Sequence, residues 1–121
     1  MSIKILEKKI GENHPTFIIV EVSANHNQSI KNIYKIIKAA AISGADAIKL
    51  QTYTADTMTL NNKIISNKIR DINSLWKGKS LYNLYKKGST PWKWHKKIFD
   101  YAKKHKLIPF STPFDKKAVD F

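Results

Sequence analysis

The sequence contains no cysteine, which excludes disulfide bonds and cysteine-ligated metal sites. Arginine is almost absent too, because only Arg70 among the 22 Lys and Arg residues is an arginine. Just 9 residues are acidic, so the formal net charge is +13. Arginine best makes bidentate contacts with phosphates and bases. An excess made almost wholly of lysine therefore favours solvated helix faces over nucleic-acid binding, which stays a remote alternative for a non-enzymatic basic protein.

Long hydrophobic runs are missing as well. No stretch approaches the roughly 18 apolar residues of a membrane-spanning helix, and residues 1–10 lack the apolar core of a signal peptide. No Gly-rich phosphate-binding fingerprint is present. The rest of the composition, with 42% hydrophobic and 26% charged residues among 121, is that of an ordinary globular chain. We expect a cytoplasmic protein with no membrane partner.

The first half of the chain predicts a strand, a helix and a second strand. Residues 17–22 form a short, nearly continuous apolar run that is typical of a buried strand. Over residues 29–43 the apolar side chains recur at helical spacing with lysines opposite, and Gly44 is a plausible stop. Residues 46–51 predict the next strand. This order within about 35 residues is a βαβ unit, with parallel strands and a right-handed crossover.

The second half continues the alternation after an interruption. Residues 52–88 are polar and weakly periodic, and we predict a long functional loop there. A helix is predicted over 91–105 with His95 on its buried face, followed by a strand over 107–111. Residues 112–115 then predict a turn that starts another helix. The fold class is therefore α/β, with about three β/α units that look like the beginning of a longer protein.

The strongest candidate site residues end the first two strands, where ligands bind in parallel α/β folds. Alternation places Lys49 and Gln51 on one face of their strand, and Ile48 and Leu50 on the helix-packed face. A lysine inside an apolar strand is costly unless it is paired. Lys49 therefore forms a structural salt bridge with Glu21, or binds an anionic substrate group, or does both. Glu21 serves only as its counter-ion, or acts as an acid or base if it is buried.

Further polar candidates follow the first and third strands. Asn25 and His26 come after the first strand, and Ser111 and Thr112 end the third. The Thr112 hydroxyl either binds a carboxylate or phosphate oxygen or caps a helix. A lone histidine such as His26 is more often a satisfied hydrogen-bonding group than a metal ligand. His14, His95 and His105 have no ligand spacing with it, so metal binding by His26 would lack partners.

Several segments resemble the sialic acid synthase family, and others its pseudaminic acid synthase branch. The family segments are IVEVSANHN at 19–27, GADAIKLQTYT at 44–54 and FSTPFD at 110–115. The branch segments are LYNLY at 81–85, TPWKWH at 90–95 and AVDF at 118–121. The resemblance implies a (β/α)8 TIM barrel followed by an antifreeze-like domain, in a homodimer. Residues 1–15 would be a lead-in and residues 16–121 the N-terminal portion of an incomplete barrel, without the antifreeze-like domain.

The resemblance also implies an activity. Enzymes of the branch condense phosphoenolpyruvate with an N-acylated sugar, 2,4-diacetamido-2,4,6-trideoxy-L-altrose, and water to give pseudaminic acid and phosphate. N-acetylneuraminate or legionaminate synthesis is the alternative within the family. Lys49 and Thr112 would contact phosphoenolpyruvate, Gln51 would lie near the sugar and Glu21 near the reacting carbons. A divalent manganese or magnesium ion would be held by histidines outside this chain, so we expect residues 1–121 alone to be inactive.

The sequence departs from the family pattern at two positions. Gln28 stands where the family often has glycine, and Gly88 stands where it often has alanine. Neither is a proposed catalytic residue, but Gln28 is expected to alter the turn after the first strand. Sugar choice is expected to depend largely on residues 52–88 and on later strands.

Overall fold

The computed structural model describes residues 2–61, 68–70, 74 and 76–121. Within them, three parallel strands form one sheet in the order β3 (Ile19–Glu21), β4 (Ala47–Thr52) and β5 (Ile108–Pro113). Strand β4 lies in the middle, because each strand pairs with the next one along the chain. The predicted α/β class and all three strands are confirmed, although β3 is shorter than predicted and β5 starts and ends later.

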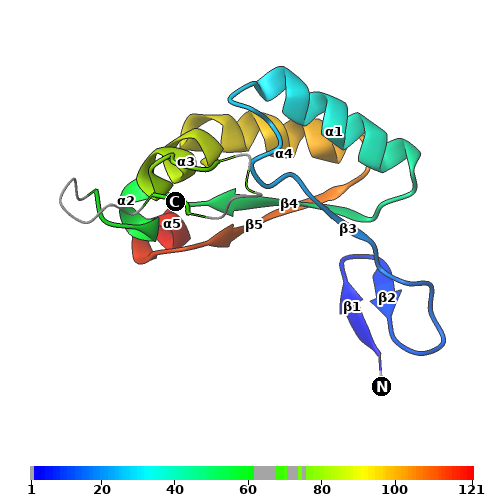
Figure 1. Ribbon diagram of the computed structural model, residues 1–121. Coiled ribbons are helices and arrows are strands. Elements are labelled where there is room, and N and C mark those ends of the chain that lie inside the picture. The colour runs from blue at the N-terminus through cyan, green and yellow to red at the C-terminus, as the bar shows by residue number, and fades with distance from the viewer. Residues whose placement is uncertain (1, 62–67, 71–73, 75) are drawn as a thin grey trace.

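Two helices, α1 (Ile30–Ile42) and α4 (His95–Lys104), cover one face of the sheet (Figure 1). Their apolar sides meet Ile48 and Leu50 of β4, which are completely buried. Taking one such side chain out of water contributes roughly 1.5–3 kcal/mol. The helices add to this core the buried residues Ile33, Ile37 and Ala40 of α1 and Ile98 and Ala102 of α4.

The predicted helix boundaries hold to within a few residues. Helix α1 lies one residue inside the predicted range at each end. Gly44 follows it with a φ of +82°, a left-handed conformation that glycine adopts at little cost and that ends the helix. Helix α4 begins later than predicted, because the 3-10 turn η1 (Trp92–Trp94) takes its first positions.

The segment between β4 and α4 differs most from the prediction of a loop. It contains a short helix, α2 (Ala55–Met58), and a longer one, α3 (Leu81–Gly88). Ser80 caps α3 by accepting a hydrogen bond from the backbone N–H of Asn83, at 3.4 Å. The helix was missed because it is short and mostly polar. Other parts of the predicted loop lie outside the described residues: 62–67, 71–73 and 75.

The N-terminal residues form an antiparallel hairpin of β1 (Ile3–Ile5) and β2 (Lys8–Ile10) (Figure 1). Asp46, at the start of β4, holds it near the sheet. Its carboxylate pairs with the Lys8 amine and accepts a hydrogen bond from the backbone N–H of Ile18 at 2.7 Å. The Lys8 hydrogen bond lowers the pKa of the Asp46 carboxyl. The alternating charged and apolar residues of 1–10 are thus a strand pattern.

The chain ends in the short helix α5 (Lys116–Asp120), which Asp115 caps by accepting a hydrogen bond from the backbone N–H of Ala118 at 2.7 Å. The predicted turn into a helix is confirmed, but the alternative that Thr112 caps this helix is wrong, because Thr112 lies within β5. None of the helices in the described ranges has the length and apolar character needed to cross a membrane.

Candidate functional site

Glu21 and Lys49 form an ion pair on the sheet face opposite α1 and α4. The parallel register sets the two residues side by side on β3 and β4, and the Lys49 amine contacts the Oε1 atom of Glu21. The Lys49 side chain is 26% exposed and that of Glu21 is 47% exposed. The predicted salt bridge is therefore confirmed. An acid or base role for Glu21 was predicted only if its side chain is buried, and the structure does not bury it.

Gln51 and Thr112 lie on the same face, further toward the carboxyl ends of the strands. They are register partners on β4 and β5, as are Lys49 and Phe110. Alternation along β4 turns Lys49 and Gln51 away from the helices, as predicted. One open sheet face thus carries a carboxylate, an ammonium, an amide and a hydroxyl, together with the apolar residue Phe110.

Ser111 lies on the other face and does not join this group. Its hydroxyl lies 2.6 Å from the Thr52 hydroxyl, which in turn lies 2.8 Å from Nε2 of His95. The His95 Nδ1–H donates to the Trp92 carbonyl at 3.1 Å, so Nε2 accepts from Thr52. His95 is 6% exposed, as its predicted place in the core requires, and burial lowers the pKa of its imidazole. A substrate-binding role for Ser111 stays a prediction that this placement does not favour.

His26 and Asn25 lie in the loop that follows β3, in different surroundings. Asn25 is exposed, whereas His26 is completely buried. The backbone N–H of Gln28 donates to Nδ1 of His26 at 3.0 Å, so Nε2 carries the proton and donates to the Gly88 carbonyl at 3.1 Å. Burial lowers the pKa of this imidazole, which keeps it neutral. The hydrogen-bonding interpretation of His26 is confirmed, and its substrate-binding role stays a prediction.

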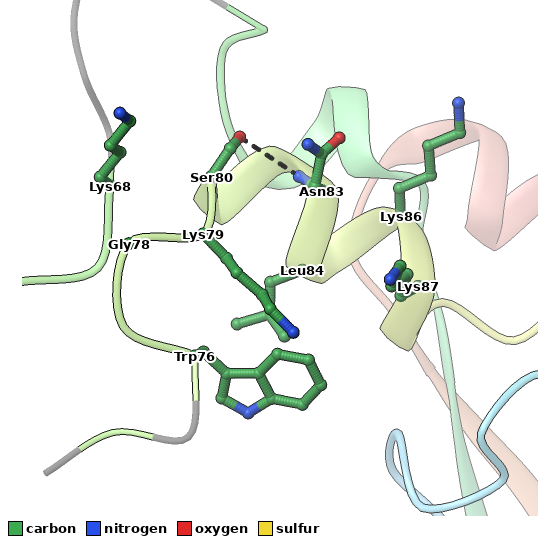
Figure 2. A pocket seen from close by; sticks show the side chains of 9 residues that line it. All are labelled: Lys68, Trp76, Gly78, Lys79, Ser80, Asn83, Leu84, Lys86 and Lys87. Carbon is green, nitrogen blue, oxygen red and sulfur yellow. Dashed lines mark hydrogen bonds between the residues drawn. The ribbon is translucent and has the colours of Figure 1, made fainter.

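A separate hollow of about 560 Å³ lies beside α3 (Figure 2). The Lys79 amine lies 4.8 Å from the centre of the Trp76 ring, a cation–π arrangement. Among the described residues, its lining contains no acidic residue and none of the predicted site residues, so it is a different surface from the Glu21–Lys49 face. The lining residues are Lys68, Trp76, Gly78, Lys79, Ser80, Asn83, Leu84, Lys86 and Lys87.

Residues 36–121 match the model of the NeuB family. The chain belongs to the NeuB family. The pseudaminic acid synthase of Campylobacter jejuni serotype O:2 is 47% identical over 105 residues, which cover 87% of this chain and 30% of the relative. That of Helicobacter pylori is 44% identical over 106 residues, 88% of this chain and 31% of the relative. The chain thus spans about 30% of the length of these curated relatives.

Solved structures resemble this NeuB-family chain over nearly its whole length. A crystal structure of N-acetylneuraminic acid synthetase from Leptospira borgpetersenii, in complex with citrate, has a TM-score of 0.78 at 28% identity and covers 99% of this chain and 36% of that one. The spore coat polysaccharide biosynthesis protein spsE of Bacillus subtilis has a TM-score of 0.69 at 28% identity, covering 99% and 30%. The predicted resemblance to the sialic acid synthase family and its pseudaminic acid synthase branch is confirmed.

The described part of this NeuB-family chain does not form a metal site. No three histidine, aspartate or glutamate side chains among the described residues gather as ligands for an ion. On the open face the carboxylate of Glu21 faces a lysine amine, and the nearest loop histidine, His26, is buried with both ring nitrogens engaged. These groups do not suit a divalent cation, which prefers carboxylates and accessible imidazoles.

The packing of Tyr53 against helix α3 was not predicted from the sequence. Tyr53 follows β4, is 6% exposed, and packs edge-on against Tyr85 of α3, with ring centres 6.0 Å apart. A Cβ atom placed on Gly88 would lie 3.1 Å from the Tyr53 hydroxyl. These contacts were not predicted because Tyr53, Tyr85 and Gly88 all lie in residues 52–88, where no helix was predicted.

Proposed function

We propose that the complete protein carrying this chain is a pseudaminic acid synthase. It condenses phosphoenolpyruvate with 2,4-diacetamido-2,4,6-trideoxy-L-altrose and water to give pseudaminic acid and phosphate, a carbon–carbon bond-forming transferase reaction. The observation that carries the proposal is the Glu21–Lys49 pair on the open sheet face, in a chain 44–47% identical to pseudaminic acid synthases. A cytoplasmic location fits, because phosphoenolpyruvate is a metabolite of the cytoplasm.

The proposed architecture is the first part of a (β/α)8 barrel. Residues 16–121 supply three β/α units and residues 1–15 lead into them, while the complete protein adds the remaining strands, an antifreeze-like domain and a homodimer. The parallel order β3, β4, β5 with helices on one face supports this arrangement. The open face with Lys49 and Gln51 then becomes the barrel interior. This also gives an exposed apolar residue such as Ile19, at 46% exposure, a place to pack.

The residue types suit the binding of phosphoenolpyruvate, which carries a carboxylate and a phosphate. The Lys49 ammonium anchors these anionic groups, and the Thr112 hydroxyl donates a further hydrogen bond. Without substrate, Glu21 neutralises Lys49, so the amine is never left uncompensated. When the substrate arrives, Lys49 exchanges a carboxylate partner for another anion and Glu21 is freed.

The proposed reaction forms one carbon–carbon bond and breaks the C2–O bond of phosphoenolpyruvate. The C3 carbon of phosphoenolpyruvate attacks the aldehyde carbon of the open-chain sugar and forms the new carbon–carbon bond. Water adds at C2, and the C2–O bond breaks to release phosphate and leave the keto acid. Glu21 either moves a proton in these steps or serves only as the counter-ion of Lys49, and Gln51 orients the sugar. A manganese or magnesium ion in the complete protein would be held by residues outside this chain.

The activity is tested by phosphate release from phosphoenolpyruvate with different N-acylated sugars. Phosphate release that depends on the altrose derivative supports the proposal. Preference for the sugar precursor of legionaminic or N-acetylneuraminic acid would instead favour the alternative specificity. An N,N'-diacetyllegionaminic acid synthase of Legionella pneumophila is 31% identical to this chain over 114 residues, below the identity of the pseudaminic acid synthases.

A further inference from the structure

Three consecutive carbonyls at the end of α3 accept hydrogen bonds from side chains of the loop that follows β3. The Gln28 amide donates to the Lys87 carbonyl at 2.7 Å and to the Ser89 carbonyl at 2.8 Å. Between them, Nε2–H of His26 donates to the Gly88 carbonyl at 3.1 Å. The last carbonyls of a helix have no partner within the helix. The loop therefore caps α3 from outside, across about 60 residues of chain.

The backbone at Gln28 shows that this contact has a conformational cost. Gln28 has a φ of +55° and Asn27 before it a φ of +45°. This left-handed region is easy for glycine and unfavourable for a residue with a long side chain. Glycine at position 28 would relieve the strain but lose both amide hydrogen bonds. The two bonds to α3 are thus what a glutamine gains there.

Gly88 makes the matching contribution from the helix side. A Cβ atom on Gly88 would meet the Tyr53 hydroxyl at 3.1 Å and the Ala24 methyl at 3.2 Å, both tighter than ordinary contact. The absence of a side chain lets the end of α3 come close enough for the Gln28 amide to span two of its carbonyls. Gln28 and Gly88 therefore lie on the two sides of one contact between the loop after β3 and the end of α3.

The contact joins the two loops that leave the candidate site. The loop after β3 begins directly after Glu21 and carries the exposed Asn25. The segment after β4 starts at Tyr53, next to the strand that carries Lys49 and Gln51, and the Trp92 indole N–H donates to the Tyr53 carbonyl at 3.3 Å. Because Tyr53 also touches α3, the end of this helix braces both loops at once.

We infer that Gln28 and Gly88 are a positioning pair that seats α3 against the loop after β3 and so sets how tightly the sugar substrate is held. This rests on the proposed function. The groups assigned to phosphoenolpyruvate, Lys49 and Thr112, and the sugar-side Gln51 are fixed by strand register and do not depend on α3. Asn25 and the segment after β4 are held by the loop contacts instead. A loosened pair therefore affects sugar binding more than phosphoenolpyruvate binding.

The test is a double-mutant cycle in the complete protein with Gln28→Ala, Gly88→Ala and both together, following initial rates with each substrate varied in turn. Loss of the hydrogen bonds to these neutral carbonyl acceptors should raise the KM for the sugar roughly 3- to 10-fold. The KM for phosphoenolpyruvate should change by less than about 2-fold. The double variant should be no worse than the poorer single variant, because the two residues act through one contact. Asn13→Ala, an exposed amide in the N-terminal region, should leave both KM values unchanged.

Equal rises in both KM values, unchanged KM values, or additive effects of the two substitutions would overturn the inference. If Gly88→Ala does not fold, Gln28→Ala and Gln28→Glu decide the question, because the glutamate keeps the shape and turns a carboxylate toward the two carbonyls. Wild-type protein that releases no phosphate with any sugar would overturn the proposed function and this inference together. Normal wild-type turnover with an unchanged sugar KM in both Gln28 variants would overturn the inference alone.

Discussion

At the scale of single residues, the central feature is a lysine between two completely buried apolar residues of the central strand. Lys49 is three-quarters buried and shares the central strand with Ile48 and Leu50, whose side chains are completely buried on the opposite face. Glu21 makes this placement tolerable, because it offers a carboxylate directly across the strand pair. A site that already balances one anion against this amine is suited to exchange it for an anionic substrate.

Removing the charge of Lys49 should weaken phosphoenolpyruvate binding. We expect Lys49→Met, which keeps most of the apolar stem, to raise the KM for phosphoenolpyruvate about 10- to 100-fold, the range for a lost charge-assisted hydrogen bond. Steady-state kinetics of the complete protein provide the measurement. Lys38→Met, on the exposed side of α1, is the matched control and should change nothing. An unaltered KM in Lys49→Met would exclude Lys49 as the anchor.

Glu21→Gln separates the two roles left open for this residue. The amide keeps the size of the side chain but cannot exchange a proton. If Glu21 moves a proton, kcat should fall about 100-fold or more. If Glu21 is only a counter-ion, kcat should stay near that of the wild type, which would exclude an acid or base role for Glu21. Single-turnover rates at saturating substrate distinguish these results.

The two buried histidines should make the protein less stable at mildly acidic pH. Burial lowers the pKa of His26 and of His95 below the usual value of about 6.5 in the folded state. Below about pH 6.5 the unfolded chain then binds more protons than the folded protein. The stabilisation is therefore fully present above pH 6.5 and falls as the pH drops below it. Thermal unfolding between pH 7.5 and 5 should show a falling Tm. His95→Gln should have a shallower slope, and equal slopes in both proteins would contradict this explanation.

At the scale of elements, periodicity predicted most of the fold. Apolar runs and helical spacing gave β3, α1, β4, α4 and β5, because each buries one regular face. Helix α3 was not predicted, because residues outside the helix stabilise it: Ser80 at its start, Tyr53 on its side and Gln28 at its end. The contacts of Tyr53 and Gln28 with α3 span long distances in sequence and are not visible in a local pattern. The same distance in sequence hid the contact between Gln28 and Gly88.

The candidate site was predicted in part for the same reason. Strand alternation places Lys49 and Gln51 together, and register adds Glu21 and Thr112. Ser111 was grouped with them because it is next to Thr112 in sequence, but adjacent residues on a strand face opposite sides. His26 was a loop candidate whose burial depends on α3, so its engagement could not be deduced from the sequence.

The N-terminal hairpin should depend on Asp46. Asp46→Ala removes the ion pair with Lys8 and the acceptor for the Ile18 N–H. We expect a loss of about 1–2 kcal/mol in the free energy of unfolding and faster amide hydrogen exchange in β1 and β2. Asp120→Ala, an exposed aspartate in α5, is the control. Unchanged exchange in the hairpin would show that Asp46 does not anchor it.

At the scale of the whole molecule, the two faces of the sheet have opposite characters. One is sealed by α1 and α4, while the other presents charged and polar groups and no described helix covers it (Figure 1). The net charge of +13 is carried mainly by lysines on exposed surfaces, and the cation to which we assign a function, Lys49, lies on this open face. Membership of the NeuB family and this two-faced layer lead to the same proposal, a barrel whose interior binds an anionic substrate.

The most direct test of this account is product analysis of the complete protein incubated with phosphoenolpyruvate and 2,4-diacetamido-2,4,6-trideoxy-L-altrose. We expect one nine-carbon keto acid, identified as pseudaminic acid by mass spectrometry and NMR, for each phosphate released. We also expect Lys49→Met to slow the formation of both products in parallel at low phosphoenolpyruvate. Release of phosphate with free pyruvate, or no phosphate release with this sugar, would contradict the central claim.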